Sequence, residues 1–281
     1  MKTIDLHTHS KISDGSMQPE ELIAYAAAKG LSAVALTDHD TAAGLERAEN
    51  AALSCGIEFI PGIELSAYYA EREVHIVGLF INYRNQAFLE KIHTVSHARE
   101  IRNLEMIKIM QAHGIDITSE KLKASEGKGI LTRANFAAYL EKTGVVSSYQ
   151  EAFDRFLEKG KPFYVPRKKL TPKDAIDAIL SAGGIPVLAH PLLYKFSDDA
   201  LDRCVLELKS LGIKALEVYY SRNLSTDTLR MKALADKYGL YYSGGSDFHG
   251  TYKPDIDIGT GTGSLVVPYE VLDRLKDLVS H

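Results

Sequence analysis

The histidines and carboxylates of this chain are concentrated directly after short apolar runs, where they could bind metal ions. His7 and His9 follow the apolar run at residues 3–6, and because side chains two positions apart in an extended chain point the same way, both imidazoles could bind one ion. Asp14 lies in a Ser-Asp-Gly turn, and His75 lies inside an apolar run. Later runs end near further candidate ligands, which are Asp38, His39, Asp40, Glu64, His190, Asp247 and His249. This bias predicts a metal site.

Imidazole and carboxylate ligands together suit Zn²⁺, Mn²⁺ or Fe²⁺ rather than Ca²⁺ or a soft copper site. The number of candidate ligands indicates more than one ion. Several ions together can polarise a phosphoryl oxygen, supply a hydroxide near neutral pH and neutralise the leaving oxygen, as hydrolysis of a phosphate ester requires. Taken singly, His75 could be a core histidine, Asp14 a turn residue and Glu64 a solvated charge. Their joint occurrence favours the metal site.

The elements that must position these side chains alternate between short apolar runs and amphipathic stretches. We expect strands at residues 3–6, 33–36, 57–60, 74–81, 185–188, 214–218, 240–242 and 264–267. We expect helices at residues 19–29, 42–55, 171–182, 200–211, 225–237 and 269–279. Gly30 and Gly56 follow the first two helices, where a C-terminal cap needs positive φ. Repeated βα units over this length predict an α/β fold with a parallel sheet, closed into a barrel or open.

Residues 87–160 differ from the rest of the chain, because they show long helical periodicity, many charges and no convincing strand. We expect residues 1–86 and 161–281 to form the barrel, and residues 87–160 to be a helical insertion that covers the active-site mouth. A simple packing layer is the alternative for this segment. The insertion also contains arginines that could bind phosphate.

Arginine binds phosphate through two parallel hydrogen bonds, so arginines near the metal site are candidates for substrate binding. Arg99 and Arg133 in the insertion are the preferred phosphate ligands, and Arg167 after it is a third candidate. Arg102 lies one helical turn from Arg99, and we expect it to be a solvated surface charge.

Bulk composition limits the partners and the location of the protein. With 45% hydrophobic and 25% charged residues among 281, the chain has the composition of a globular protein, and its net charge of −4 gives no broad basic surface for duplex DNA or a membrane. Two cysteines cannot form a disulfide framework, and no apolar leader opens the sequence. We therefore expect a cytoplasmic protein without a membrane or duplex DNA partner, in which arginines or metal ions hold any anionic substrate.

Taken in order, these motifs resemble those of PHP phosphoesterases, a family named for polymerase and histidinol phosphatase. The motifs are DLHTHS at residues 5–10, SDG at 13–15, LTDHD at 36–40, PGIE at 61–64, AHP at 189–191 and SDFH at 246–249. They span nearly the whole chain, and their combination is highly specific. The resemblance implies a distorted seven-stranded (β/α) barrel with a trinuclear site, holding two to three divalent ions (Mn²⁺, Zn²⁺ or Fe²⁺).

The ligands that the resemblance implies fall into three groups, with Glu64 bridging the first two ions. They are His7, His9, Glu64 and Asp247 for the first ion, Glu64, His75 and His190 for the second, and Asp14, His39 and His249 for the third. We expect Asp38 and Asp40 to orient a water or His39, and we predict that both act with His190 as catalytic residues.

The resemblance is greatest to stand-alone bacterial PHP proteins that act on nucleotides, including nucleoside 3',5'-bisphosphate phosphatases and 5'-to-3' exoribonucleases. It implies hydrolysis of the 3'-phosphate of a nucleoside 3',5'-bisphosphate, of short 5'-phosphorylated RNA, or of both. Asn135 is a departure, since relatives commonly carry histidine there. A histidinol-phosphate-type phosphatase is one alternative, and an amidohydrolase acting on an amide or lactone is another, although no bridging lysine is evident. A domain that only senses or stores metal is a third.

Overall fold

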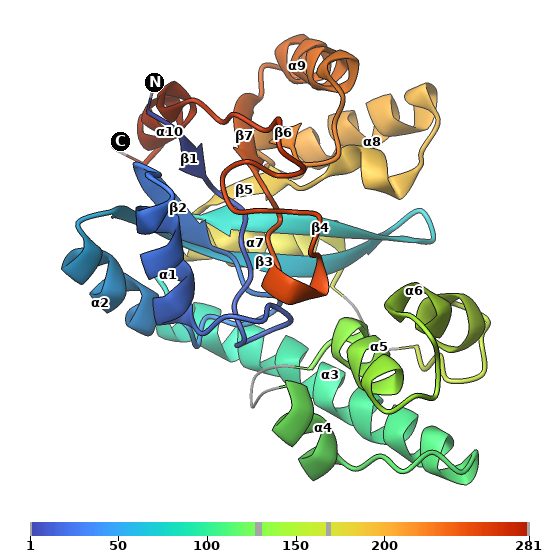
Figure 1. Ribbon diagram of the computed structural model, residues 1–281. Coiled ribbons are helices and arrows are strands. Elements are labelled where there is room, and N and C mark those ends of the chain that lie inside the picture. The colour runs from blue at the N-terminus through green and yellow to red at the C-terminus, as the bar shows by residue number, and fades with distance from the viewer. Residues whose placement is uncertain (1, 127–130, 167–169, 280–281) are drawn as a thin grey trace.

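Seven strands of the described chain pair in sequence order in one sheet that curves almost into a closed barrel (Figure 1). This computed structural model describes residues 2–126, 131–166 and 170–279. The first and last strands are β1 (Ile4–Asp5) and β7 (Tyr241–Gly245). They meet through backbone hydrogen bonds from Leu6 N to Gly244 O at 3.1 Å and from Asp247 N to His7 O at 2.8 Å. The predicted seven-stranded α/β barrel is therefore confirmed.

The direction of one strand differs from the prediction. The middle strands are β2 (Ala33–Leu36), β3 (Glu58–Tyr69), β4 (Arg72–Leu79), β5 (Ile185–Leu188) and β6 (Ala215–Tyr220). Among these described strands β4 alone runs antiparallel to its neighbours, so the expectation of an all-parallel sheet is wrong there. The reason is a two-residue turn at Ala70 and Glu71, which have φ of 43° and 62° and leave no room for a crossover helix.

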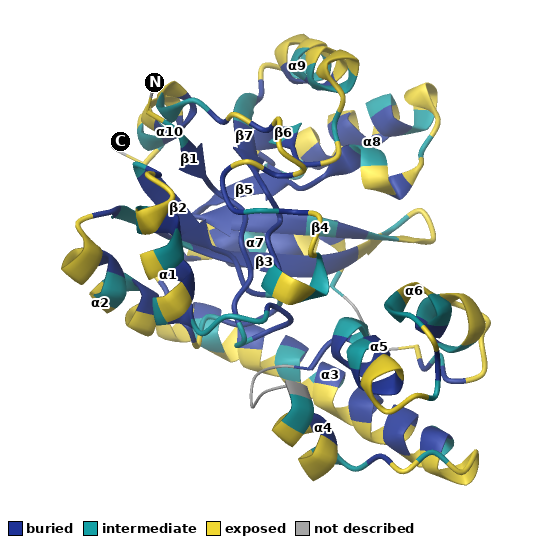
Figure 2. Ribbon diagram, in the orientation of Figure 1, coloured by how far each residue is buried: buried dark blue, intermediate teal, exposed yellow. Residues whose placement is uncertain are grey.

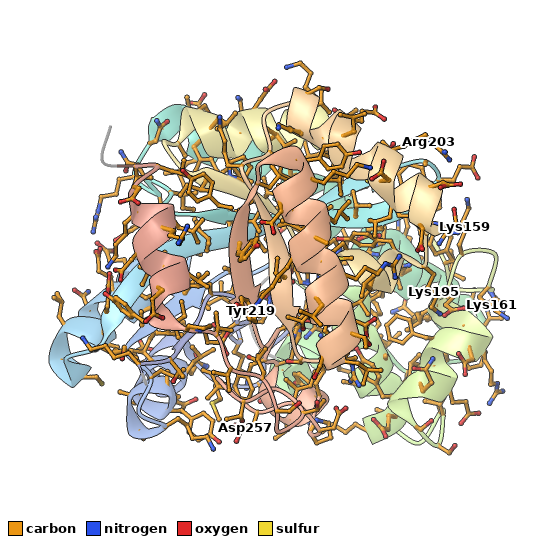
Figure 3. The ribbon with its side chains drawn as sticks, turned by 90° about the horizontal axis from the view of Figure 1, so that it is seen from above. Lys159, Lys161, Lys195, Arg203, Tyr219 and Asp257 are labelled. Carbon is orange, nitrogen blue, oxygen red and sulfur yellow. The ribbon has the colours of Figure 1, made fainter. Side chains whose placement is uncertain are left out.

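Six of the described helices pack on the outside of the barrel and bury one face each against it (Figure 2). They are α1 (Pro19–Ala28), α2 (Leu45–Cys55), α7 (Pro172–Ser181), α8 (Asp198–Ser210), α9 (Ser225–Tyr238) and α10 (Tyr269–Lys276). Gly56 caps α2 with φ of 68°, as expected. Charged side chains such as Lys159 and Arg203 point outward at one edge of the molecule (Figure 3).

The prediction of a strand at residues 264–267 is wrong. This segment has no strand geometry, and it meets the first strand through the hydrogen bond from Ile4 N to Val267 O and an isolated bridge between Thr3 and Pro268. β7 already lies beside β1, so the segment reaches the start of β1 without forming an eighth strand of the barrel.

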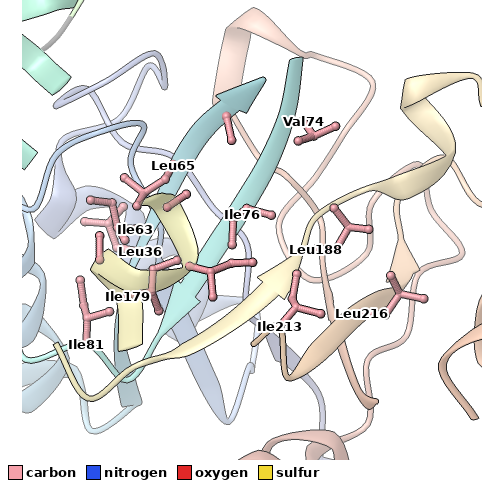
Figure 4. Packing of buried hydrophobic residues seen from close by; sticks show 14 of the residues in the cluster. Leu36, Ile63, Leu65, Val74, Ile76, Ile81, Ile179, Leu188, Ile213 and Leu216 are labelled. Atoms are coloured by element: carbon pink, nitrogen blue, oxygen red, sulfur yellow. The ribbon is translucent and has the colours of Figure 1, made fainter. Parts of the chain in front are cut away.

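One hydrophobic core is made of aliphatic side chains from the strands and from α7, which packs on them (Figure 4). Ile63, Ile76 and Ile179 are fully buried within one cluster. At Gly78 a Cβ atom would lie 2.8 Å from Cγ1 of Ile179, so only glycine lets α7 approach β4 this closely. This packing gives the strand ends a rigid base.

A helical segment lies between β4 and β5. It contains α3 (Gln86–Ala112), α4 (Ser119–Glu126), α5 (Arg133–Lys142), α6 (Tyr149–Ala152) and a π-helix, η1 (Phe153–Leu157). These elements have a hydrophobic cluster of their own around Met106 and Phe136, whereas Phe88 at the start of α3 belongs to the barrel core. We propose that residues 87–160 form an insertion in the barrel, and the separate hydrophobic cluster supports this division. Among the described helices, none combines the length and apolar character needed to span a membrane.

Candidate active site

The nine predicted metal ligands come together at one end of the barrel. His7 and His9 follow β1, His39 follows β2, and His190 follows β5 as the residue before the short 3₁₀ helix η2 (Pro191–Tyr194). Asp14 comes from the turn before α1, Glu64 from β3 and His75 from β4, while Asp247 and His249 follow β7, just before η3 (Gly250–Tyr252). All are buried except His39 and His75, which are partly exposed.

Glu64 lies at the centre of this cluster, and its two carboxylate oxygens face different imidazoles. Oε1 lies 2.9 Å from His75 Nδ1 and 3.0 Å from His190 Nε2. Oε2 lies 3.4 Å from His7 Nε2, 3.2 Å from His9 Nε2 and 3.1 Å from His39 Nδ1. A carboxylate with ligand atoms on both sides has the geometry of a bridge between ions.

Two further carboxylates complete the cluster. Asp14 lies 3.4 Å from His249 Nε2 and 3.6 Å from His39 Nε2. Asp247 lies 3.3 Å from His9 Nε2. Ligand atoms within 4.8 Å of one another define four possible sites, which are His9 with Asp14, His39 and His249; His7 with Glu64 and His190; His7 with His9 and Asp247; and His39 with Glu64 and His75.

The direction of β4 explains how His75 reaches the cluster. In the antiparallel pair, His75 lies opposite Ser66 of β3. Because β4 runs against its neighbours, its early residues lie at the end of the barrel where the other strands finish. A histidine near the start of a strand therefore reaches side chains that follow other strands.

Buried polar atoms without hydrogen bonds test whether this cluster fits metal ions. Among the described residues, such atoms include His7 Nε2, both ring nitrogens of His9, His39 Nδ1, His190 Nδ1 and Glu64 Oε2. A buried nitrogen or oxygen left without a partner is unfavourable in a folded protein. Coordination of divalent ions would satisfy these atoms, so the donor set fits a multi-ion site.

Electrostatics keep the central carboxylate charged. Burial alone would raise the pKa of Glu64, but the imidazoles of His39, His75 and His7 hold this pKa well below its usual range. Asp247 behaves in the same way, because Lys253 and His249 outweigh burial and lower its pKa. Both side chains are therefore anions at neutral pH, as metal coordination requires.

Glu217 of β6 contacts two of the candidate ligands, although none of the sequence motifs includes it. Its Oε1 lies 2.9 Å from His7 Nδ1, and its Oε2 accepts a hydrogen bond of 2.6 Å from the backbone N of His190. The contact with Nδ1 directs Nε2 of His7 towards Glu64. A charged residue inside the apolar run Ala215–Tyr220 was the available signal.

Glu217→Gln should lower kcat/KM for the phosphate ester by about 10- to 100-fold, a size usual for residues that orient a metal ligand. The amide cannot accept both contacts, so His7 loses its fixed orientation. Turnover and bound metal per chain, measured on the same sample, check this. Glu207→Gln, which changes an exposed carboxylate of α8, is the matched control. Wild-type turnover and metal content in the Glu217 variant would contradict the assignment.

Several site residues have strained backbone. His190, Asp247 and Asp40 have φ of 27°, 56° and 52°, in a region that residues other than glycine rarely adopt. Each directly follows or closely follows a strand. Such strain persists where surrounding contacts hold it, and it is common at functional sites.

Asp38 and Asp40 hold neighbouring segments in place. Asp38 accepts hydrogen bonds from Ser10 N at 2.8 Å and from the Ser13 hydroxyl at 2.7 Å, so it fixes the turn that carries Asp14. Asp40 accepts a hydrogen bond of 3.0 Å from Ser66 N and one from the guanidinium of Arg99. We expected Asp38 and Asp40 to orient a water or His39, but they contact Ser10, Ser13, Ser66 and Arg99. A catalytic role for either aspartate stays a prediction.

A cavity of about 140 Å³ lies beside the cluster. Asp14, His39 and His75 line one part of it, and Arg99, Arg102 and Arg133 line another. Arg102 is only 4% exposed, so the expectation that it is a solvated charge is wrong. Arg102 and Arg99, one helical turn apart on α3, are both buried and both line this cavity. Arg167 lies outside the described residues.

The helical segment also contacts the cluster directly. Thr132, just before α5, donates a hydrogen bond of 3.1 Å to Asp14 Oδ2. Arg133 follows it and lies 3.3 Å from Glu73. Thr132 is far from Asp14 in the sequence, and no local pattern marked it as part of the site.

Comparison with known proteins identifies the family. A family model described as the PHP domain matches residues 5–169. The chain belongs to the PHP family. It is 35% identical over 260 residues to a 3',5'-nucleoside bisphosphate phosphatase of Chromobacterium violaceum, covering 92% of this chain and 91% of that protein. It is also 36% identical over 248 residues to a 5'-3' exoribonuclease of Haemophilus influenzae, covering 88% and 90%.

Solved structures of PHP-type proteins agree with this assignment. A protein from Chromobacterium violaceum, described as an amidohydrolase with bound sulfate and no metal, superposes with a TM-score of 0.87 at 32% identity, covering 98% of this chain and 96% of that one. A protein from Bifidobacterium adolescentis described as a metal-dependent phosphoesterase gives a TM-score of 0.86 at 27% identity, covering 99% and 96%. The predicted family, fold and class of metal-dependent phosphoesterase are confirmed.

Proposed function

We propose that this PHP protein removes the 3'-phosphate of nucleoside 3',5'-bisphosphates, and that short 5'-phosphorylated RNA can enter the same site. The observation that carries this proposal is the shared cavity, in which three arginines lie beside the candidate metal ligands. A substrate with two phosphates could place one at the cluster and the other at the arginines. The names of the two similar proteins, a bisphosphate phosphatase and an exoribonuclease, support this choice.

The nine clustered residues would hold two to three divalent ions, Mn²⁺, Zn²⁺ or Fe²⁺. Such ions supply positive charge to the phosphoryl oxygens and an activated water near neutral pH. The two oxygens of Glu64 support the division proposed from the resemblance, because Oε1 faces His75 and His190 while Oε2 faces His7 and His9. His190 then acts as a ligand, and its strained backbone sets its orientation.

Arg99, Arg102 and Arg133 would together bind the second phosphate. Burial alone would lower the pKa of Arg99, but Asp40 raises it, so this guanidinium is a fixed cation tied to the barrel. Arg102 and Arg133 line the same cavity from α3 and from the start of α5. We therefore add Arg102 to the predicted phosphate ligands Arg99 and Arg133.

Arg102→Ala should raise KM for adenosine 3',5'-bisphosphate by about tenfold and change kcat little, because a hydrogen bond to a charged group contributes in the bound and transition states alike. Adenosine 3'-monophosphate lacks the 5'-phosphate, so its KM should change much less. Steady-state kinetics on both substrates measure this difference. Lys108→Ala, which removes an exposed cation of the same helix outside the cavity lining, is the matched control. Equal increases of KM for both substrates would show that Arg102 is structural.

Release of inorganic phosphate from adenosine 3',5'-bisphosphate tests the proposed function. Short 5'-phosphorylated RNA, histidinol phosphate, amides and lactones should be assayed with the same metal-loaded protein. We expect the bisphosphate or the RNA to give the highest kcat/KM. Hydrolysis of an amide or lactone with no phosphate release would refute the proposal in favour of an amidohydrolase. The predicted cytoplasmic location and the absence of a duplex DNA partner remain part of the proposal.

A further inference from the structure

The cavity beside the metal ligands also carries aromatic side chains. Phe153 and Tyr164 line it together with Arg102 and Arg133. Neither aromatic residue belongs to the candidate metal sites, and hydrolysis of a phosphate requires neither of them. Aromatic rings beside arginines and a hydrolytic centre have the chemistry to bind a planar group of the substrate.

A π-helix places Phe153 at the cavity. The turn η1 begins at Phe153, directly after α6, and the backbone N of Glu158 donates to Phe153 O at 3.2 Å, five residues back. Turns of this type are rare and are frequent at functional sites. The ring of Tyr149 lies 5.3 Å from that of Phe153 and supports it from within the helical segment.

Packing behind the cavity fixes the position of Tyr164. Its neighbour Phe163 is 2% exposed and stacks on Phe156 of the π-helix, with ring centroids 4.8 Å apart and an interplanar angle of 13°. A backbone hydrogen bond of 3.0 Å from Phe163 N to Phe156 O holds the same pair. Tyr164 and Phe153 thus line the cavity from segments that pack on each other, and such preorganisation lowers the entropy cost of binding a ligand there.

Arg133 connects this aromatic wall to phosphate binding. Its guanidinium lies 5.7 Å from the centroid of the Tyr164 ring. A phosphate bound by Arg133 would therefore lie next to the aromatic side chains. In a nucleotide, the base and the 5'-phosphate are attached to one sugar, so a base could reach this wall while the phosphate contacts the arginine.

We infer that Phe153 and Tyr164 form a stacking site for the nucleobase of the substrate, which makes them specificity-determining residues for nucleotides over base-free phosphate esters. This inference rests on the proposed function. Stacking uses the π-face that all nucleobases share, so the site should accept purines and pyrimidines. Loss of this stacking should raise KM for a nucleotide by about tenfold.

The test compares adenosine 3',5'-bisphosphate with 1-deoxyribose 3,5-bisphosphate, which has the same two phosphates and no base. Wild-type enzyme should have a KM about tenfold lower for the nucleotide. Phe153→Leu keeps an apolar side chain but removes the ring, so it should raise KM for the nucleotide and bring the two KM values together. Phe153→Tyr restores a ring and should recover the preference. Phe59→Leu, a partly buried phenylalanine in β3 outside this cavity, is the control.

The outcomes separate this inference from the proposed function. Equal KM values of wild-type enzyme for the two bisphosphates would overturn the stacking site and leave the phosphatase proposal intact. An unchanged preference in Phe153→Leu and in Tyr164→Leu, both with wild-type unfolding temperature, would also overturn it. Release of phosphate from neither bisphosphate, by protein loaded with metal, would reject the proposed function itself.

Discussion

Glu64→Gln should lower kcat/KM for phosphate release by at least about 10³-fold, and the purified variant should bind at least one ion fewer per chain than the wild type. The substitution keeps the shape of the side chain and removes the charge at the centre of five imidazoles, whose nitrogens lie 2.9–3.4 Å from its oxygens. Both candidate bridged sites lose a ligand at once, so a single change should affect two ions. Phosphate assays and elemental analysis of the same preparation measure both effects.

The control for this variant is Glu105→Gln, which removes an exposed carboxylate from α3 and should keep wild-type activity and metal content. The unfolding temperature of both variants shows whether the barrel stays folded. A folded Glu64→Gln enzyme with wild-type turnover would mean that the cluster is not the catalytic centre.

Removal of metal should abolish turnover and lower the unfolding temperature by about 5 °C or more. An ion that binds only the folded state adds about 2.7 kcal/mol to the free energy of unfolding when its concentration is a hundred times its Kd. In a chain of this size, a change of 1 kcal/mol shifts the unfolding temperature by about 2–4 °C. The physical reason is the burial of Asp14, Glu64 and Asp247 beside one another, which costs free energy when no cation offsets their charge. Scanning calorimetry before and after treatment with a chelator measures this.

Separate addition of Mn²⁺, Zn²⁺ and Fe²⁺ to the chelated protein then identifies which ion restores activity and stability. Glu64→Gln should show a smaller shift on chelation, because it has fewer ions to lose. Full activity and an unchanged unfolding temperature in the chelated wild-type protein would rule out metal as a resident cofactor.

The structure also changes the expected roles of the arginines. The sequence predicts Arg99 and Arg133 as the preferred phosphate ligands, yet the guanidinium of Arg99 binds Asp40 and lies 3.3 Å from the Ser66 hydroxyl. Asp40 follows β2, so this ion pair joins α3 to the barrel beside the cluster. A substrate phosphate at Arg99 would have to share the guanidinium with Asp40. Arg102, expected to be solvated, is instead buried in the cavity wall.

Much of the fold could be predicted from the sequence, because strand runs and helix ends depend on residues that are close together in the chain. The strands at Ala33–Leu36 and Ile185–Leu188 agree with their apolar runs, and Pro19 and Gly56 lie at helix ends as their backbone preferences require. The antiparallel direction of β4 was not predicted, because an apolar run is compatible with either strand direction. Ala70 and Glu71, which make the turn, are residues that seldom mark a hairpin.

The sequence by itself determined the family, the ligand types and the positions after strand ends, because these follow from motifs of a few adjacent residues. Only the tertiary structure decided that a reversed strand brings the predicted ligand His75 to the cluster, and that Glu217 contacts His7 across 210 residues of chain. It also decided that Arg102 and Phe153 line one cavity. Contacts of this kind depend on how distant segments pack. A pattern of a few neighbouring residues does not show which distant residue will contact them in the folded protein.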